Sequence, residues 1–481
     1  MSNTAQSLAG KRIASLLDEN SFVEIGAGIT ARNTDFNMAK AETPADGVIT
    51  GYGVINDKLV YVYSQDASVL GGTIGEMHAK KISGIYDMAM KMGAPVIGLI
   101  DCAGLRLQEA TDAMNAFGDI YMKQTLASGV IPQITAIFGN CGGGLALVPG
   151  MTDFTFMEEK NAKLFVNSPN ALDGNRVEKC DTASAKFQSE ETGLVDYAGS
   201  EEDIFAQIRD LVSVLPANNE DDTYYAESED DLNRVCADLA NCVGDTSILL
   251  SNIADDNLFI ETKAAYAKDM VTGFLRLNGQ TVGAVANRTE VYDAEGTKTD
   301  SFDAVLTRKG AEKAAEFVKF CDAFEIPVLS LTNVTGFKAD IHSEKGIAKA
   351  AAKLTYAFAN ATVPKVNVVI GKAYGSAYSV MNSKATGADM TFAWPTAEIG
   401  TMDAKLACKI MYPEATAAEL NEKAAEYAAL QTSAVSAARR GYVDTIIEAE
   451  DTRKYVIGAF EMLFTKRDDR PGKKTRNSLS E

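Results

Sequence analysis

Histidine is nearly absent from this sequence, and other marks of common enzyme classes are missing as well. The 481 residues include only two histidines, His78 and His342. A His-rich metal site is therefore excluded, and a Ser-His-Asp triad would have to use one of these two. No apolar run approaches the roughly 18 residues that a membrane-spanning helix requires. Tryptophan occurs once, at Trp394, which we predict to be a packing residue.

Paired cysteine motifs are missing too. None of the seven cysteines lies in a Cys-x-x-Cys motif, and no secretory signal is recognisable at the N-terminus. We therefore expect reduced thiols and a cytoplasmic location.

Basic residues are outnumbered, with 46 Lys and Arg against 66 Asp and Glu and a net charge of −20. This balance argues against a nucleic-acid or anionic-membrane partner. It still admits a polyanionic small ligand, which needs only a local basic patch. The length suits two large or three smaller domains, and the apolar and charged fractions, 46% and 23%, are ordinary for a soluble globular protein.

From residue 47 onward the pattern predicts an α/β protein. Residues 48–63 are typical of a β-hairpin, and residues 75–92 of a helix ended by Gly93. The apolar runs 95–100 and 134–138 are typical of buried parallel strands. We also predict a short helix within residues 1–20 and a long helix over residues 415–440.

The second half of the sequence repeats the first. Residues 271–278 echo residues 49–56 at an interval of 222. The remaining matches share an interval of 232: residues 94–97 with 326–329, Gly104 with Gly336, residues 131–134 with 363–366, and residues 139–145 with 371–377. A constant interval over several elements indicates a duplicated α/β domain, in which each half carries one strand–glycine–helix turn.

The two glycine turns suggest a chemistry. In the first, Gly142-Gly143-Gly144 follows a predicted strand and leads into residues 145–148, which could open a helix. Backbone N–H groups in such a turn can stabilise a developing oxyanion. Two such sites suit the transfer of a carboxyl group between biotin and an acyl-CoA, which creates negative charge on a thioester oxygen and on a ureido oxygen. That reaction needs no enzymic histidine, because the released biotin nitrogen can accept the α-proton.

Longer motifs carry a family resemblance over roughly residues 21–465. The sequence resembles the carboxyltransferase subunits of biotin-dependent acyl-CoA carboxylases and decarboxylases, of the propionyl-CoA carboxylase beta and methylmalonyl-CoA decarboxylase alpha type. The matching segments are residues 46–51, 64–66, 71–80, 127–133, 215–219, 317–324, 356–365, 372–375, 393–399 and 440–444. The resemblance implies an α/β fold of two duplicated ClpP/crotonase-like superhelical domains.

The resemblance also implies site residues. Gly143 and Gly144 match the pair of residues that holds the thioester enolate, and Ser376 and Ala377 match the pair that faces biotin. The residues expected to bind substrate and CoA are Gly104, Arg106, Gly142, Gly336, Gly375, Tyr378 and Ser379. No metal is implied.

The cofactor implied is biotin on a separate carrier protein, and the substrate is a short-chain CoA thioester. The implied partners are a biotin carboxyl carrier protein and either a biotin carboxylase or a membrane decarboxylase subunit. The family usually forms a hexamer, in which CoA lies mainly on the first half of one subunit and biotin mainly on the second half of another.

Several positions depart from the family pattern. Ser376 replaces a glycine that is common in the second turn, and Ser379 occupies a position linked to acyl-chain choice. Residues 102–106 and 334–340 also differ from the usual loop sequences. These changes concern the substrate rather than the fold.

Other signals have ordinary interpretations. Residues 89–92 spell the biotin-attachment tetrapeptide, but they end a predicted helix, so we expect the biotin on another polypeptide. We expect His78 to be structural and Lys80 and Lys81 to be solvated.

We predict the following organisation: an N-terminal helix (1–20), a first carboxyltransferase domain (21–200), an acidic linker (201–262), a second carboxyltransferase domain (263–465) and a basic tail (466–481). The leading functional hypothesis is an acyl-CoA carboxylase subunit. The alternative is the alpha subunit of a sodium-pumping decarboxylase acting on methylmalonyl- or glutaconyl-CoA. A single-site crotonase-type hydratase or hydrolase, or an inactive scaffold, are further alternatives.

Overall fold

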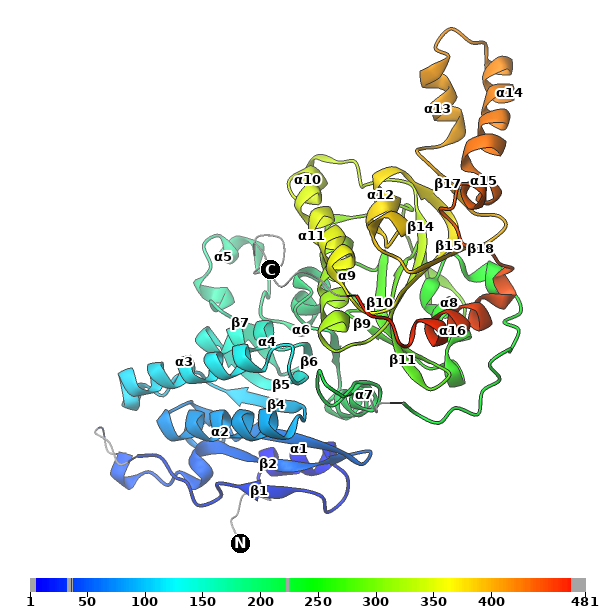
Figure 1. Ribbon diagram of the computed structural model, residues 1–481. Helices are drawn as coiled ribbons and strands as arrows, with labels where there is room; N and C mark the ends of the chain where they lie inside the picture. The colour runs from blue at the N-terminus through cyan, green and yellow to red at the C-terminus, as the bar shows by residue number, and fades with distance from the viewer. Residues whose placement is uncertain (1–5, 33–35, 37, 222–224, 469–481) are drawn as a thin grey trace. The chain divides into compact units, whose positions relative to one another are not determined.

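The computed structural model of the chain describes residues 6–32, 36, 38–221 and 225–468. The chain divides into two compact units, Met1–Tyr224 and Tyr225–Glu481, and each contains its own large β-sheet (Figure 1). No helix in these described stretches is long and apolar enough to cross a lipid bilayer.

The first unit is built on an eight-stranded sheet with the order β1-β2-β3-β4-β5-β6-β8, in which β7 also pairs with β5. β1, β2 and β3 are antiparallel, and every later pairing is parallel. The strands are β1 (Val23–Ile25), β2 (Val48–Ile55), β3 (Lys58–Gln65), β4 (Val96–Cys102), β5 (Gln133–Gly142), β6 (Phe154–Glu158), β7 (Lys163–Phe165) and β8 (Tyr197–Gly199). The predicted hairpin and buried parallel strands are therefore confirmed.

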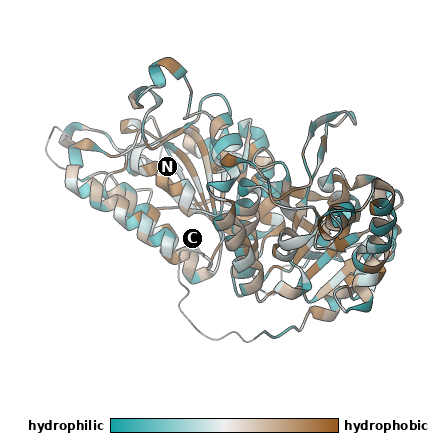
Figure 2. Ribbon diagram, turned by 90° about the horizontal axis from the view of Figure 1, so that it is seen from above, coloured by the Kyte–Doolittle hydropathy of each residue, from teal (hydrophilic) through white to brown (hydrophobic). Residues whose placement is uncertain are grey.

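Helices α2 and α3 pack side by side in the first unit (Figure 1). α2 ends as predicted at Gly93, whose φ of 61° is the left-handed conformation that glycine adopts without steric cost. The helices are α1 (Leu8–Leu16), α2 (Glu76–Met92), α3 (Ala110–Ala127), α4 (Val148–Met151), α5 (Asn175–Glu178), α6 (Ala185–Phe187) and α7 (Glu201–Val214). Figure 2 shows hydrophobic residues concentrated along the strands and hydrophilic residues spread over the outer helices.

The second unit repeats this plan with the strand order β18-β16-β15-β14-β11-β10-β9, and β17 also pairs with β15. Its strands are β9 (Phe259–Thr262), β10 (Met270–Leu277), β11 (Gln280–Asn287), β14 (Val328–Val334), β15 (Lys365–Tyr374), β16 (Met390–Ala393), β17 (Glu398–Gly400) and β18 (Thr445–Ile446). Its helices are α8 (Thr246–Ile253), α9 (Arg308–Ala323), α10 (Ile341–Glu344), α11 (Ile347–Asn360), α12 (Gly375–Val380), α13 (Ala404–Met411), α14 (Ala417–Tyr427), α15 (Ala434–Arg439) and α16 (Thr452–Leu463).

The structure explains why the repeat interval changes along the sequence. β10 and β11 follow β2 and β3 at an interval of 222 residues, whereas β14 and β15 follow β4 and β5 at 232. Between β11 and α9 the second unit inserts an antiparallel ribbon, β12 (Glu290–Tyr292) and β13 (Lys298–Ser301). The ribbon lies where the interval changes, so the duplicated core on either side of it keeps its register.

The acidic segment predicted as a linker over residues 201–262 contains folded elements. α7 belongs to the first unit and buries Ile204, Ile208 and Leu211. β9 is a strand of the second sheet, paired with β10. The apolar spacing of α7 is the helical i, i+4, i+7 pattern, which its many acidic residues obscured in the sequence. The predicted basic tail lies outside the described residues from 469 onward.

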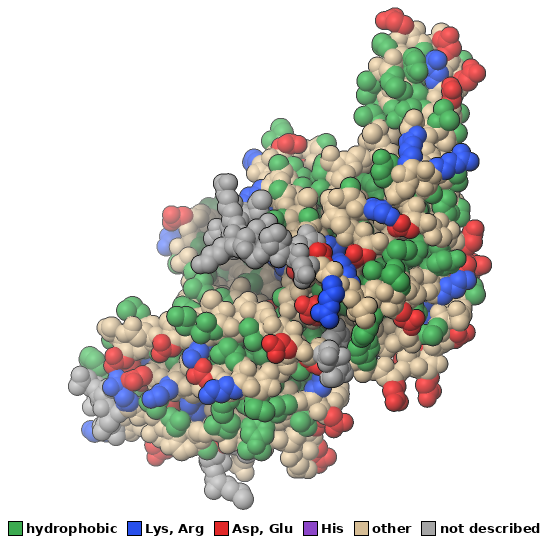
Figure 3. Space-filling view, viewed as in Figure 1, with side chains coloured by type: hydrophobic (Ala, Val, Ile, Leu, Met, Phe, Trp, Pro, Cys, Tyr) green, Lys and Arg blue, Asp and Glu red, His purple; other side chains and the backbone are tan. Residues whose placement is uncertain are grey.

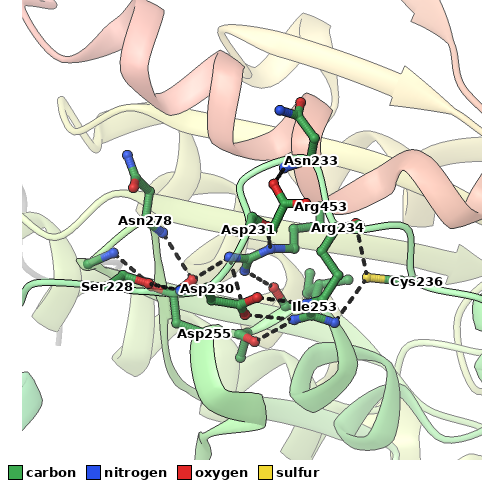
Figure 4. Close-up of polar contacts among 12 residues, drawn as sticks. Ser228, Asp230, Asp231, Asn233, Arg234, Cys236, Ile253, Asp255, Asn278 and Arg453 are labelled. Atoms are coloured by element: carbon green, nitrogen blue, oxygen red, sulfur yellow. Dashed lines mark hydrogen bonds and ion pairs between the residues drawn. The ribbon is translucent and has the colours of Figure 1, made fainter.

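The start of the second unit is fastened to its core by two arginines (Figure 4). Arg453 of α16 is fully buried and lies 2.7 Å from Asp255 and 3.4 Å from Asp230. Arg234 forms a second ion pair with Asp230 at 2.9 Å. Asp230 and Asp255 therefore pair with a fully buried arginine, Arg453, which a solvated linker would lack.

The long helix predicted over residues 415–440 is divided in two. α14 ends at Tyr427, a wider π-type turn follows, and α15 restarts at Ala434 with the Ser433 hydroxyl accepting from the Ser436 N–H. A serine that caps a new helix explains the break. α13 pairs with α14 and exposes Leu406, Ile410 and Met411. Figure 3 shows hydrophobic side chains on the surface of this hairpin.

Candidate active-site turns

The first glycine turn, residues 142–145, lies at the carboxyl end of the central strand β5. Cys141 pairs with Cys102 of β4, and Gly142 pairs with Phe165 of β7, so neighbouring strands support both sides. Gly143 has a φ of 62°, and no atom lies within 4 Å of the position that a Cβ would take there. A 3-10 turn, Gly143–Leu147, follows and leads into α4, which is shorter than the helix the sequence suggested.

The second glycine turn, residues 374–377, lies at the carboxyl end of β15. Gly375 has a φ of 58°, matching Gly143 at the interval of 232. α12 begins at Gly375, with Ser376 exposed and Ala377 buried. The Tyr374 hydroxyl before the turn makes a short contact with the carboxylate of Glu398 from β17. Both halves of the chain therefore place a left-handed glycine at the same point of the sheet.

The N–H groups at the start of each turn take no part in the helical hydrogen bonds that follow. The first N–H groups of any helical segment have no acceptor within it. In the α-helical second turn these donors include Ser376 and Ala377. In the tighter 3-10 pattern only the first two are left over, which are Gly143 and Gly144. Gly144 and Ser376 occupy equivalent positions, so these two are the donor positions that the turns share.

Two loops predicted to bind substrate are also equivalent. In the first unit Ile74 donates its N–H to the Gly104 carbonyl at 2.9 Å, and in the second Leu306 donates to the Gly336 carbonyl at 2.8 Å. Gly104 has a φ of 107°, and a Cβ built on it would lie 3.8 Å from the Gly142 carbonyl oxygen. The structure therefore brings Gly104 beside the first glycine turn.

The structure corrects the prediction that Arg106 binds substrate or CoA. It is fully buried, and its Nη1 lies 2.6 Å from Asp46 Oδ1 and 2.8 Å from Glu109 Oε1. The carboxylates in turn accept from the α2 backbone, Glu109 from the Glu76 N–H and Asp46 from the His78 N–H, both at 2.7 Å. Arg106 thus joins a loop to the start of a helix, and its guanidinium is not presented to a CoA phosphate.

Lys81, which we expected to be solvated, is also buried. Its Nζ donates to the carbonyls of Ala45, at 2.8 Å, and Val48. Burial lowers the pKa of Lys81 to about 8. Lys313, at the interval of 232, likewise donates to the carbonyls of Tyr266 and Met270. Each lysine therefore closes the loop that precedes a sheet hairpin.

The Tyr378 and Ser379 side chains, also predicted to bind substrate, follow the second turn and are half-buried. Burial raises the pKa of Tyr378 to about 12. The Ser379 hydroxyl donates back to the Gly375 carbonyl at 3.4 Å. Trp394 is buried as predicted and donates to the Thr452 hydroxyl at 3.0 Å.

His78 is buried and held as a neutral ring. Its Nδ1 lies 2.9 Å from the Asp46 carbonyl oxygen, which can only accept, so Nδ1 carries the proton and Nε2 accepts from Gln65 Nε2 at 3.2 Å. Burial, followed by the charge of Arg106, lowers its pKa to about 3. These contacts agree with the structural role predicted for His78.

We expect His78 to make the protein sensitive to acid. In the unfolded chain a histidine takes up a proton below pH 6.5, whereas the folded protein resists protonation until about pH 3, so stability falls as the pH falls below 6.5. Between pH 6.5 and pH 5 this amounts to about 2 kcal/mol. In urea unfolding from pH 8 to pH 5, His78→Gln should be less stable at pH 8, and its deficit should shrink toward pH 5. His342→Gln, at an exposed position, is the control; equal pH profiles for all three proteins would contradict the prediction.

Carboxylates close to the turns have partners. Asp101, beside Gly139, forms an ion pair with Arg12 at 3.1 Å, and Glu398 contacts the Tyr374 hydroxyl. Within the described stretches, no group of three or more His, Cys, Asp or Glu side chains is arranged to hold a metal ion.

Comparison with known families shows the class of protein to which the chain belongs. Residues 3–478 match the family described as the carboxyl transferase domain. The chain belongs to the carboxyl transferase family. It is 41% identical to the propionyl-CoA carboxylase beta chain of Roseobacter denitrificans, over 98% of this chain and 93% of the relative. It is 38% identical to the methylmalonyl-CoA decarboxylase subunit alpha of Veillonella parvula, over 98% and 92%.

A solved structure agrees with this assignment to the carboxyl transferase family. The chain superposes on transcarboxylase 12S, a hexamer solved with hydrolysed methylmalonyl-coenzyme A bound, with a TM-score of 0.90 and 35% identity, over 98% of this chain and 92% of that one. The predicted carboxyltransferase activity and the predicted duplicated crotonase-like α/β fold are thereby confirmed.

Proposed function

We propose that this carboxyltransferase moves a carboxyl group between biotin on a separate carrier protein and a short-chain acyl-CoA. The observation that carries the proposal is the pair of equivalent turns, each with a left-handed glycine at a strand end and N–H groups that have no acceptor within the helical segment that follows. The relatives named for propionyl-CoA and methylmalonyl-CoA support a substrate of that size.

The first turn holds the thioester oxygen. The Gly143 and Gly144 N–H groups donate to it as negative charge develops in the enolate, and one such donor contributes about 10²–10³ in rate. Gly144 is exposed, and Gly143 has open space where a side chain would lie, so the thioester can approach the backbone closely. We assign Gly104 and Gly142 to the wall of this half-site.

The second turn holds the ureido oxygen of biotin. When bound, biotin supplies the carboxyl group and, after release, a nitrogen that accepts the α-proton. The residues present fit such a group, because Ser376 is exposed and the N–H groups of Ser376 and Ala377 precede the helical hydrogen bonds of α12. The serine at position 376 leaves its backbone donor in place. Gly336, Gly375, Tyr378 and Ser379 complete our assignment for this half-site.

The leading version is a propionyl- or acetyl-CoA carboxylase that works with a biotin carboxylase. The alternative is the alpha subunit of a sodium-pumping decarboxylase for methylmalonyl- or glutaconyl-CoA. Both kinds of relative match the chain at similar identity. Purification of the native complex distinguishes the versions, because a biotin carboxylase favours the first and an integral-membrane subunit the second. We further propose a cytoplasmic homohexamer, supported by the hexameric assembly of transcarboxylase 12S.

Carboxyl exchange tests the proposed function directly. The purified protein is mixed with free biotin or carboxybiotin and with malonyl-, methylmalonyl- or glutaconyl-CoA, and transfer of labelled carboxyl carbon is measured. We expect exchange with at least one thioester and its loss when excess avidin removes the biotin. A protein that transfers carboxyl carbon with none of them would refute the proposal.

A further inference from the structure

We propose that Tyr121 is a positioning residue for the first glycine turn, a role that rests on the proposed function of that turn. The Tyr121 hydroxyl donates a hydrogen bond of 2.6 Å to the Gly144 carbonyl oxygen. Tyr121 belongs to α3, a helix that precedes the turn by more than a dozen residues, so the hydrogen bond ties the turn to a separate element.

With this hydrogen bond, the turn is held by contacts on both sides. On one side Gly142 is held by its pairing with Phe165 of β7. On the other side Tyr121 holds the Gly144 carbonyl. The two peptide groups that carry the Gly143 and Gly144 N–H lie between these supports. Because glycine residues rotate freely about φ and ψ, such a segment needs outside contacts to keep both donors aimed at one oxygen.

Comparison with the second turn shows why the first needs this support. The second turn continues into the regular α-helix α12, whereas the first continues into a 3-10 turn, whose hydrogen bonds have poorer geometry. At the interval of 232, Tyr121 corresponds to Lys353, so the second unit has no tyrosine at the equivalent helix position. The less regular turn is therefore the one that a tyrosine hydroxyl supports through a hydrogen bond.

The Tyr121 hydroxyl remains a hydrogen-bond donor at neutral pH. Tyr121 packs against Phe117, with ring centroids 6.0 Å apart, which fixes the phenol on the turn. Burial, with a smaller contribution from Cys141, raises the pKa of Tyr121. The hydroxyl consequently keeps its proton at neutral pH, and its donation also polarises the peptide group that it binds.

The same hydroxyl explains the glycine at position 144. A Cβ built on Gly144 would lie 3.0 Å from the Tyr121 oxygen, and its next neighbour is a Phe117 ring atom at 3.8 Å. Gly144→Ala would therefore push the hydroxyl away from its carbonyl partner. Tyr121→Phe would remove the hydroxyl and make room for the alanine.

The test uses Tyr121→Phe, Gly144→Ala and the double variant. Each single variant should lower kcat for carboxyl transfer about 3–10-fold, the effect of one ordinary hydrogen bond, while KM for the acyl-CoA stays within twofold. Because both substitutions disturb the same hydroxyl, the double variant should be no slower than the slower single variant. Thr125→Val is the control, since its hydroxyl on the same helix bonds to the Tyr121 backbone carbonyl and not to the turn.

A binding measurement separates positioning from mere structural support. The probe is a CoA thioether that carries a nitronate, an anionic mimic of the enolate, compared with the neutral alkyl thioether by calorimetry. Tyr121→Phe should weaken binding of the nitronate about 3–10-fold and leave the neutral ligand unchanged. If the variant matches wild type in kcat and in nitronate affinity, or if single effects multiply in the double variant, the positioning role is refuted. If wild type itself neither transfers carboxyl carbon nor prefers the nitronate, the proposed function fails instead.

Discussion

Ser376→Pro should lower the rate of carboxyl transfer about 10²–10³-fold, the usual effect of losing one oxyanion donor. Proline removes the backbone N–H that we assign to the biotin-facing turn. Ser376 is the second residue of α12 and is exposed, and the first turn of a helix is where proline is tolerated. The rate is measured by the exchange assay at saturating acyl-CoA.

Ser376→Ala is the matched control for this prediction. It removes the hydroxyl but keeps the backbone N–H. Because the hydrogen bond from this N–H is retained, the transfer rate should stay within about twofold of wild type. The nitronate ligand should bind equally to wild type and to Ser376→Pro, because that ligand uses the first turn. Equal losses in the alanine and proline variants would show that the side chain, and not the backbone donor, is what the reaction needs.

The sequence was sufficient to predict the duplicated fold because its decisive signals are local. Apolar runs, turn glycines and a constant interval are read along the chain, and they located β5, β15 and both glycine turns. The family resemblance then named the chemistry. Apolar periodicity failed to predict two features. The apolar face of α7 is masked in the sequence by acidic residues. At Ser433, a serine that caps α15 breaks the helix that was predicted to continue.

What the sequence could not show are contacts between distant residues. Arg106 was predicted to bind CoA, but its partner Asp46 lies 60 residues away in sequence, and burial of the pair becomes visible only in the folded chain. Tyr121 carried no motif at all, and its role follows from one hydrogen bond across 23 residues. The assignment of site residues to substrate remains a prediction that the variants above are designed to test.

Arg106→Met should be the most destabilising of the substitutions considered, by about 3–5 kcal/mol. Methionine fills similar space without charge, and removing one partner of a buried ion pair leaves the other uncompensated. Here two carboxylates, Asp46 and Glu109, would remain buried, and a third contact to the Thr73 carbonyl would be lost. Because these groups tie the loop after β4 to the start of α2, the loss should also loosen Gly104. The measurement is the urea midpoint of the first unfolding transition.

Lys338→Met is the control for Arg106→Met, because the duplication places Lys338 at the equivalent position of the second unit. Lys338 stands at the interval of 232 from Arg106 and pairs with Asp303 at 2.9 Å, but both side chains are exposed. Solvent screens such a pair, so this variant should unfold like wild type. Asp46→Asn added to Arg106→Met should recover part of the loss, because one buried charge is removed.

The Arg106→Met deficit should also depend on pH. Burial already raises the pKa of Asp46, and the charge and hydrogen bond of Arg106 are the largest causes that oppose this rise. Without the arginine, the folded pKa of Asp46 rises further above its unfolded value, so the carboxylate is penalised at neutral pH and the penalty is relieved as the pH falls and the group takes up a proton. The stability gap to wild type should therefore be smaller at pH 5 than at pH 8. Equal destabilisation by Arg106→Met and Lys338→Met, or a gap that widens toward pH 5, would show that the buried charge cluster does not control the stability of the first unit.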